Sequence, residues 1–562
     1  MRSTSIAYRD EMPANHYDVI VIGGGHNGLV AAGLLAKAGK RVVVLERREV
    51  VGGAAVTEQP FGPDYKVTAL SYVVSLMPPA ISRALDLERH GYRIYPQGGY
   101  FVPYEDGRHL RLPDDPAERH RQIGKFSTRD ADAMVRWDEW LAGLADVLGP
   151  LLSAVPPRLG SKRPSDLADL SKLGWHLRHL DVQTVGEVTR LFTSSIADLL
   201  ESEFESEQIK GVLSVSGVIG TWAGPRSPGT AYVMAHHKIG DVGPAGGTEA
   251  DGKLGAWGFP AGGMGGVTSA LRSAAEHFGA TVRTDAPVVR ITTHGSRATG
   301  VVLSSGEEVL APVVITTTHP KISFLKLLDR GELPDDFITW IERWQTRSGT
   351  VKVNLALDRL PTFTSHPEFH PEVHGGTIVM AQSLDRVEQA FQDAVAGRPA
   401  ALPFADICIP SVFDPTLAPA GKHVMSMFTQ WVPHSWADEP HHDELSAYAD
   451  RLIASVEAVA PGFTASILHR QVIGPYDMEH TYGLVGGNIF HGELSAGQLF
   501  HMRPAPGYAD FRTPIAGLYQ AGSATHGGGG VTGIPGLNVV AAIREDQRSD
   551  RRRHPFRRPS GR

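Results

Sequence analysis

The stretch that decides the fold is Tyr17-Asp-Val-Ile-Val-Ile-Gly23-Gly-Gly-His-Asn-Gly28, close to the N-terminus. It opens with a short apolar run rich in β-branched residues, which is typical of a central parallel strand buried on both faces. Residues Leu29 to Lys37 then favour a helix, and Gly39 is placed to end it. A second apolar strand, Arg41 to Leu45, closes at Glu46. This order of strand, glycine loop, helix and strand predicts a dinucleotide-binding α/β fold of the Rossmann type.

Each glycine of this loop has a distinct expected role. Gly23 permits the tight turn, Gly25 lets backbone amides reach a pyrophosphate, and Gly28 allows the helix to pack closely on the strand. The phosphates are then expected at the positive end of the helix. Glu46 is placed to accept hydrogen bonds from the adenosine ribose hydroxyls, and its charge would repel a 2′-phosphate.

Two further features favour FAD over NAD as the nucleotide. The glycine pair Gly52-Gly53 follows Glu46, where flavoproteins of this fold place glycines near the cofactor. Near the C-terminus, Thr513 to Gly533 supplies another strand and a glycine-rich loop, and a helix is expected from about Leu537. The start of that helix would stabilise negative charge on a reduced flavin. No second strand–GxGxxG–helix is present, so we expect one non-covalently bound FAD and no separate NAD(P) domain.

The 562 residues are too many for one ordinary core, so we expect two domains. Nucleotide-binding segments are predicted at 15–110, 255–345 and 485–545, and the intervening residues 111–254 and 346–484 form an inserted substrate domain. Residues 1–14 and 546–562 are predicted to be disordered tails, the second of them rich in arginine. Weak attraction of this tail to an anionic membrane surface is the alternative.

Composition excludes several classes of protein. A formal net charge of -7 argues against nucleic acid as a partner, and no apolar run is long enough to span a bilayer. The N-terminus lacks the apolar region of a secretory signal. Cys408 is the only cysteine, so redox chemistry must come from a bound cofactor and not from a dithiol. We expect a cytoplasmic protein, in the mitochondrial matrix if eukaryotic, with transient membrane-surface contact if its substrate is lipid-soluble.

One apolar stripe has two interpretations. Trp137, Trp140, Leu141, Leu144, Leu148, Leu151 and Leu152 follow helical spacing. A helix that faces the core or lines a substrate tunnel is favoured, and a membrane-docking helix is the alternative.

The sequence resembles the phytoene desaturase-like branch of the FAD-dependent amine oxidase superfamily over nearly its whole length. Within that branch it is most similar to the pyridine nucleotide-disulfide oxidoreductase domain-containing group, and the O-type β-carotene ketolases are close relatives. The stretches that carry the resemblance are 18–32, 52–57, Ser227-Pro-Gly-Thr230, 255–265, Gly486-Gly-Asn-Ile-Phe-His-Gly492 and the C-terminal glycine segment.

The resemblance implies a three-segment FAD-binding domain with an inserted α+β substrate domain and the flavin ring at their boundary. It also implies that Val288 contacts adenine through its backbone, and that Gly522, Gly530 and Val531 lie along the ribityl chain and flavin ring. Two positions depart from the pattern. Ala54 stands where phytoene desaturases carry arginine, which counts against simple phytoene desaturation, and Gly527 stands where relatives often have proline.

Candidates for catalysis are fewer, because flavin hydride chemistry often needs no protein acid or base. His526, in the C-terminal glycine loop, and His491 are the candidate catalytic or flavin-tuning groups. His236 and His237 have no acidic or cysteine partner in the sequence pattern, so no metal site is predicted.

The resulting hypothesis is an FAD-dependent oxidoreductase that desaturates or oxidises a hydrophobic, polyunsaturated substrate of carotenoid or isoprenoid type. Two alternatives stay open. One is a redox-neutral flavin-dependent isomerase, and the other is a flavin-binding regulatory protein with little turnover. Oligomeric state is left open.

Overall fold

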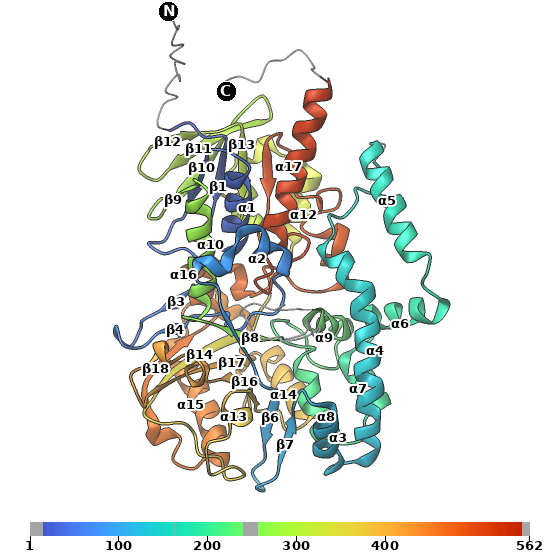
Figure 1. Cartoon of the computed structure of the whole chain (residues 1–562), viewed down its shortest axis with the longest axis vertical. Helices are drawn as coiled ribbons and strands as arrows, with labels where there is room; N and C mark the ends of the chain where they lie inside the picture. The colour runs from blue at the N-terminus through green and yellow to red at the C-terminus, as the bar shows by residue number, and fades with distance from the viewer. Residues whose placement is uncertain (1–14, 162, 240–256, 554–562) are drawn as a thin grey trace, which may run out of the picture.

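The computed structural model describes residues 15–161, 163–239 and 257–553. The predicted tail 1–14, residues 554–562 of the predicted tail 546–562 and the motif residues Gly255 and Ala256 lie outside the described residues. The chain forms two stacked parts (Figure 1). A parallel sheet with its helices makes up one part, and a larger mixed sheet with helices makes up the other. The predicted α/β class is confirmed.

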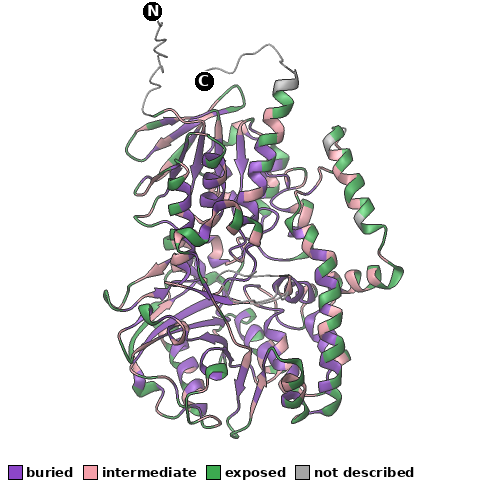
Figure 2. Ribbon diagram, viewed as in Figure 1, coloured by how far each residue is buried: buried purple, intermediate pink, exposed green. Residues whose placement is uncertain are grey.

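The first part is built on a five-stranded parallel sheet of order β19-β13-β1-β2-β9. Its strands are β1 (Val19–Ile22), β2 (Val42–Leu45), β9 (Thr281–Arg283), β13 (Val313–Thr316) and β19 (Leu518–Gln520). Alternate residues of β1 and β2 pack into two different hydrophobic clusters, one on each face of the sheet. Burial on both faces is why these strands read as continuous apolar runs (Figure 2).

Three smaller antiparallel sheets accompany the parallel sheet. A three-stranded antiparallel sheet lies beside the parallel one and contains β10 (Val288–His294), β11 (Arg297–Leu303) and β12 (Glu308–Leu310). Two antiparallel pairs are β3 (Thr57–Glu58) with β4 (Val67–Thr68), and β5 (Ile94–Pro96) with β8 (Gly258–Pro260).

The second part is a seven-stranded mixed sheet of order β18-β14-β17-β16-β15-β6-β7. Its strands are β6 (Tyr100–Pro103), β7 (His109–Leu112), β14 (Thr350–Leu357), β15 (Thr377–Val379), β16 (Phe404–Cys408), β17 (His423–Gln430) and β18 (Ile467–Ile473). The predicted boundary at residue 110 is corrected, because it puts β6 and the first half of β7 in the nucleotide-binding part. The reason is that β6 pairs with β15, and a pairing over such a distance along the chain leaves no local pattern.

Seventeen α-helices are assigned among the described residues, and α1, α10 and α17 pack together against the parallel sheet. Their bounds are α1 His26–Lys37, α2 Pro79–Leu85, α3 Pro116–Gly124, α4 Thr128–Ser153, α5 Pro164–Leu177, α6 Val182–Thr193, α7 Ile196–Glu203, α8 Glu207–Val215, α9 Thr230–Lys238, α10 Met264–His277, α11 Pro320–Leu325, α12 Asp335–Arg343, α13 Pro371–His374, α14 Leu384–Val395, α15 His442–Val459, α16 Pro475–Tyr482 and α17 Ile534–Arg553.

Helix α4 carries the apolar stripe noted in the sequence. Its positions Trp137, Leu141, Leu144 and Leu148 are buried in the core of the second part, Leu152 is also buried, and Leu141 lines the central cavity. The stripe therefore faces the protein interior. Within residues 15–161, 163–239 and 257–553, no helix is both long and apolar enough to cross a membrane.

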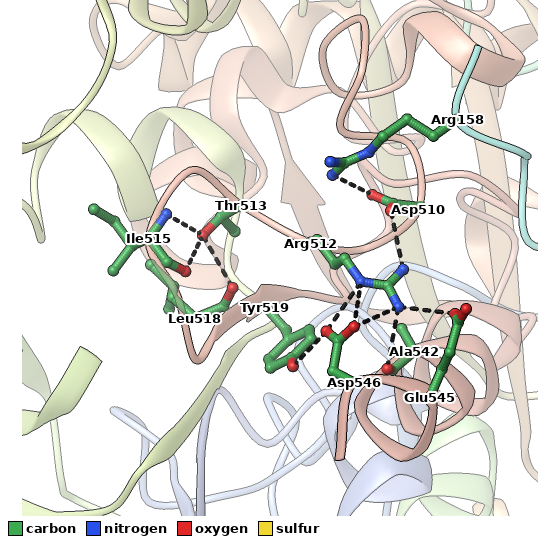
Figure 3. Close-up of polar contacts among 10 residues, drawn as sticks. All are labelled: Arg158, Asp510, Arg512, Thr513, Ile515, Leu518, Tyr519, Ala542, Glu545 and Asp546. Atoms are coloured by element: carbon green, nitrogen blue, oxygen red, sulfur yellow. Dashed lines mark hydrogen bonds and ion pairs between the residues drawn. The ribbon is translucent and has the colours of Figure 1, made fainter. Parts of the chain in front are cut away.

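Helix α17 runs to Arg553, so residues 546–553 are helical and not part of a disordered tail as predicted. Figure 3 shows the contacts that hold this helix to the sheet. The Arg512 guanidinium is 2.9 Å from both Glu545 and Asp546, and the Tyr519 hydroxyl donates to Asp546 at 2.9 Å. Asp510 lies 2.9 Å from the same guanidinium. These contacts join residues that lie far apart in the sequence. The charged segment 546–553 therefore shows no local pattern from which its helix could be predicted.

Candidate functional site

The loop between β1 and α1 has two kinds of glycine. Gly23 has a φ of +99°, and a Cβ there would lie 2.6 Å from Thr317 Oγ1. A Cβ on Gly28 would overlap the Gly23 carbonyl oxygen. Gly25 differs, because its φ is -69° and no protein atom lies within 4 Å of its Cβ position. Gly23 and Gly28 are therefore required by the fold, whereas the bare backbone of Gly25 faces open space in front of the helix N-terminus.

Glu46 is held inside this loop. Its carboxylate accepts a hydrogen bond from Gly24 N at 2.7 Å and another from Arg48 N at 2.9 Å. The side chain is buried. Its fixed position at the end of β2 keeps an acceptor beside the glycine loop. Val288 begins β10 two residues after Ala286, whose N–H donates to the Glu46 carbonyl at 2.8 Å, so Val288 lies close to the same strand end.

The pair Gly52-Gly53 lies directly against the first loop. Gly52 N donates to Gly24 O at 2.9 Å, and the nearest atom to a Cβ on Gly53 would be Gly25 Cα at 3.8 Å. Gly52 and Gly53 both have positive φ, of +130° and +59°. Gly25 and Gly53 thus form one cradle of exposed backbone that side chains would fill.

The C-terminal glycine loop brings a second helix start to the same place. A Cβ on Gly536, in the first turn of α17, would overlap Asn27 O, so the starts of α1 and α17 are in close contact. The Asn27 amide donates to Ser523 Oγ at 3.2 Å and joins the two loops. Two helix N-termini side by side create a positive field that favours a phosphate or another anion.

Three predicted residues lie along this second loop. A Cβ on Gly522 would lie 2.7 Å from Thr317 O, and one on Gly530 would lie 2.5 Å from Leu76 Cδ1. Val531 is buried with a φ of +58°, which is a genuine outlier for a β-branched residue. Strained backbone of this kind is concentrated at ligand sites.

A cavity of about 900 Å³ lies between the two parts of the molecule. At one end it is lined by the glycine loops, through His26, Ala54, Ser523, Gly530 and Val531. Its walls are mostly apolar and include Leu76, Ile94, Met134, Leu141, Ile219 and Phe490. The cavity is therefore an apolar chamber that opens onto the bare backbone of the nucleotide loops.

The seven-stranded sheet contributes a polar floor to this cavity, which the sequence reasoning missed. Lys352 on β14 and Asp406 on β16 both line it and are both buried. Burial lowers the pKa of Lys352 to about 7. Burial also raises the pKa of Asp406 to about 7, against a hydrogen bond from Tyr72 and the charge of Lys352. The available sequence signal was a single charged residue inside each of two apolar strands, Val351-Lys352-Val353 and Ala405-Asp406-Ile407.

The two candidate histidines occupy different environments. His491 lines the cavity with a φ of +57°, its Nδ1 has no hydrogen-bond partner among the described residues, and burial lowers its pKa to about 3. His526 does not line the cavity. Its Nε2–H donates to Leu151 O at 2.9 Å, and burial lowers its pKa to about 4. His526 thus ties the glycine loop to α4, which favours a structural role, whereas His491 is positioned to touch a ligand in neutral form.

Arg503 is a second residue that the sequence reasoning missed. It is 2% exposed, and its guanidinium donates to the carbonyls of Phe490 at 2.6 Å, Ser523 at 3.2 Å and Thr525 at 3.2 Å. Burial lowers its pKa to about 10. Arg503 therefore links the C-terminal glycine loop to the segment that supplies the cavity wall.

His236 and His237 are both buried on α9, and burial lowers their pKa values to about 3 and about 4. His237 lines the cavity and its Nδ1 lies 2.8 Å from Val233 O. Within the described ranges, no group of three or more histidine, cysteine, aspartate or glutamate side chains is arranged to hold a metal ion.

Comparison with known families and structures agrees with this geometry. Residues 21–85 match the family model of the NAD(P)-binding Rossmann-like domain. An oxidoreductase from Methanosarcina mazei has a similar fold, with a TM-score of 0.58 and 17% identity over 94% of this chain and 99% of that one. At this identity the likeness concerns the fold alone.

Relatives are similar over nearly their full length. A limonene dehydrogenase component of Castellaniella defragrans is 26% identical over 94% of both chains. Prolycopene isomerase 1 of an Oncidium hybrid cultivar is 25% identical over 94% of this chain and 84% of its own. Pyridine nucleotide-disulfide oxidoreductase domain-containing protein 2 of Rattus norvegicus is 39% identical over 552 residues, which cover 94% of both chains. On that extent of identity, this chain belongs to the pyridine nucleotide-disulfide oxidoreductase domain-containing protein 2 family.

Proposed function

We propose that this protein is an FAD-dependent oxidoreductase whose substrate is an apolar, polyunsaturated molecule of carotenoid or isoprenoid type. The observation that carries the proposal is the continuity of one cavity, which runs from Gly530 and Val531 of the nucleotide loops along an apolar wall. A cavity of about 900 Å³ is in the range of small-molecule sites that bury most of their ligand. An apolar substrate gains free energy by leaving water for such a wall.

FAD suits the residues at the loop end. The cradle of Gly25 and Gly53 admits a diphosphate at backbone distance, and the α1 N-terminus supplies N–H groups to it. Glu46 would accept from the adenosine ribose, and Val288 would meet the adenine. Gly522, Gly530 and Val531 would lie along the ribityl chain and the flavin ring, where the cavity begins.

The chemistry divides between cofactor and chain. A bound flavin supplies a two-electron acceptor for a hydride that leaves a substrate carbon. The chain's apolar wall excludes water and orients the substrate C–H bond toward the loop end. His491 is held neutral by burial and touches the ligand without placing a charge beside it. The starts of α1 and α17 stabilise negative charge at the loops.

Redox-neutral isomerisation of double bonds is the second candidate function. The observation that favours it is the similarity to prolycopene isomerase 1 over 94% of this chain. Desaturation consumes an electron acceptor in proportion to product, whereas isomerisation does not, so the two functions differ in a measurable quantity.

The first test is the visible absorption spectrum of the purified protein before and after denaturation. Flavin bands that move into the supernatant would support non-covalent FAD. Anaerobic mixing with a C40 polyene or a monoterpene is then expected to bleach these bands, with an alkyl amine as the control. If the protein has no flavin and does not bind added FAD, the proposal is wrong. If the amine alone bleaches the flavin, the substrate class is wrong.

A further inference from the structure

The polar floor of the cavity is a row of side chains across three adjacent strands. In the sheet register, Lys352 on β14 lies opposite Phe428 on β17, and Phe428 lies opposite Asp406 on β16. Residues directly opposite on neighbouring strands present their side chains to the same face. All three line the cavity. A base and an acid are thus held on one face, with an aromatic ring between them.

Tyr72 lies over this row and connects its ends. The Lys352 ammonium is 4.1 Å from the centre of the Tyr72 ring, and the Tyr72 and Phe428 ring centres are 6.4 Å apart. Burial and, after it, the nearby charge of Asp406 raise the pKa of the Tyr72 hydroxyl, so this hydroxyl lies close to the Asp406 carboxyl. Tyr72 follows Ser71, whose N–H donates to the Ala54 carbonyl at 3.3 Å, so the row adjoins the Gly52-Gly53 loop.

The charged groups of this floor have fewer partners than burial requires. Lys352 is 1% exposed, and the one hydrogen bond of its ammonium within the described part of the chain is to Ser426 Oγ. An ammonium has three donors, so two of them have no protein acceptor there. No ion pair within 4.0 Å joins Lys352 to a carboxylate among the described residues. Burying such groups is costly unless something completes their hydrogen bonds.

A ligand group is the natural partner, because few polar residues in an apolar pocket usually fix a ligand's orientation. The chemistry of the floor restricts this group. A charged end group meets one favourable and one unfavourable partner: a carboxylate is attracted by Lys352 but repelled by Asp406, and an amine is attracted by Asp406 but repelled by Lys352. A hydroxyl or carbonyl meets neither repulsion and can accept from Lys352, and a hydroxyl can also donate to Asp406.

We propose that Tyr72, Lys352 and Asp406 form a subsite that binds an uncharged oxygen-bearing group, a hydroxyl or a carbonyl, on an otherwise apolar substrate. This inference rests on the proposed function, because the same cavity holds the substrate. It makes these three side chains determinants of specificity, and it places the oxygen-bearing end of the substrate toward the Gly52-Gly53 loop.

The test compares polyenes that differ in one end group. The FAD-loaded protein is titrated with all-trans-retinol, with the hydrocarbon that lacks its hydroxyl, with retinoic acid and with retinylamine. Binding is followed by energy transfer from tryptophan, since Trp257 lines the cavity. We expect retinol to bind about ten-fold more tightly than each of the others, as one well-made hydrogen bond to a charged group predicts.

Variants locate the preference. Lys352→Met and Tyr72→Phe are expected to bring retinol and the hydrocarbon to within two-fold of each other. Lys422→Met is the matched control, because Lys422 pairs with Asp358 and does not line the cavity. The double variant Lys352→Met/Asp406→Leu replaces both charges by apolar groups, so it remains informative if a single variant fails to fold. It is expected to prefer the hydrocarbon.

Each outcome decides something. Equal affinity of the wild-type protein for retinol and the hydrocarbon overturns the subsite but leaves the apolar cavity and its substrate class standing. Tightest binding of retinoic acid or retinylamine also overturns it, because one charge of the floor would then dominate. If none of the four probes binds to flavin-containing protein, the substrate class of the proposed function fails together with the subsite.

Discussion

Two regions of the central cavity, here called the loop end and the floor, are built in opposite ways. The loop end consists of backbone, with glycines 25 and 53 forming an open cradle before two helix N-termini. The floor consists of side chains, with Lys352 and Asp406 carried by neighbouring strands of the large sheet. Backbone recognises what all ligands of a fold share, whereas side chains can change without changing the fold. On the proposed function, the loop end therefore specifies the nucleotide and the floor specifies the substrate.

The largest effect is expected at Arg503, which joins the C-terminal glycine loop to the cavity-wall segment around Phe490. Arg503→Met removes the donors to the carbonyls of Phe490, Ser523 and Thr525. The Thr525 carbonyl keeps the Gly528 N–H at 3.0 Å, whereas the Phe490 and Ser523 carbonyls lose their donor. Buried carbonyls left without a donor cost about 1–3 kcal/mol each, so the free energy of unfolding should fall by roughly 2–6 kcal/mol. Denaturant unfolding measures this. Arg503→Lys keeps the charge but loses the planar guanidinium, so its free energy of unfolding should lie between those of the wild-type protein and Arg503→Met. An unchanged midpoint for Arg503→Met would show that the Phe490 and Ser523 carbonyls do not need the guanidinium as a donor.

Gly25→Val tests the loop end alone. Since φ is -69° and no protein atom lies within 4 Å of the Cβ position, the fold should tolerate valine. The side chain would occupy the space proposed for the diphosphate, so the dissociation constant for FAD should rise roughly 100-fold, or about 3 kcal/mol.

Flavin fluorescence titration checks this result. Gly143→Val is the control, because Gly143 on α4 also has open space at its Cβ position but lies away from the loops. If Gly25→Val binds FAD as tightly as the wild-type protein, the cradle of Gly25 and Gly53 is not part of the nucleotide site.

The two charged residues of the floor should make the stability of the protein depend on pH. Asp406 has a raised pKa of about 7, so its contribution to stability is greatest below pH 4 and is lost as pH rises toward 7. Lys352 has a lowered pKa of about 7, so its contribution is full above pH 10.5 and is lost as pH falls toward 7. The destabilisation that comes from burying Asp406 and the destabilisation that comes from burying Lys352 are therefore both large near pH 7. Lys352→Met/Asp406→Leu should therefore gain stability over wild type, by about 1–4 kcal/mol, mainly near neutral pH.

Unfolding at pH 4, 7 and 10 measures this difference. A gain that is equal at all three pH values would mean that the two groups do not titrate as the burial of the floor requires.

His526 provides the matching pH test at the loop end. Its pKa is lowered to about 4, so the stability it contributes is full above pH 6.5 and is lost as pH falls from 6.5 toward 4. His526→Gln keeps a donor for Leu151 O but does not titrate. Between pH 6.5 and 5 the variant should lose about 1–2 kcal/mol less than wild type. Identical acid profiles in thermal melts would rule out this role.

The smallest effect is expected outside both ends. Glu545, on α17, forms an ion pair with Arg512, and the Glu545 side chain is 43% exposed. Because exposed ion pairs contribute little, Glu545→Gln should change the free energy of unfolding by less than about 1 kcal/mol and leave FAD affinity unchanged. A larger shift in either quantity would mean that the contacts between Arg512 and α17, drawn in Figure 3, also affect the stability or the geometry of the cofactor loops.

The first strand and its glycine loop could be predicted, because each requirement is local. Gly23 needs positive φ and Gly28 needs close packing, and both needs are visible within twelve residues of sequence. The roles of the two candidate histidines could not be separated in this way. His526 and His491 both lie in glycine-rich segments, and only their tertiary neighbours, Leu151 O for one and the cavity for the other, distinguish them.

The sequence by itself determined the Rossmann unit, since backbone geometry over short spans leaves a pattern in glycine and β-branched residues, and its resemblance along the chain indicated the family. Only the tertiary structure decided that β6 and β7 join the large sheet, that α17 continues to Arg553 and that Lys352 and Asp406 share one face. The physical reason is that strand register and the packing of distant segments set these contacts. A lone charged residue in an apolar strand gains its meaning only from the neighbours that folding brings to it.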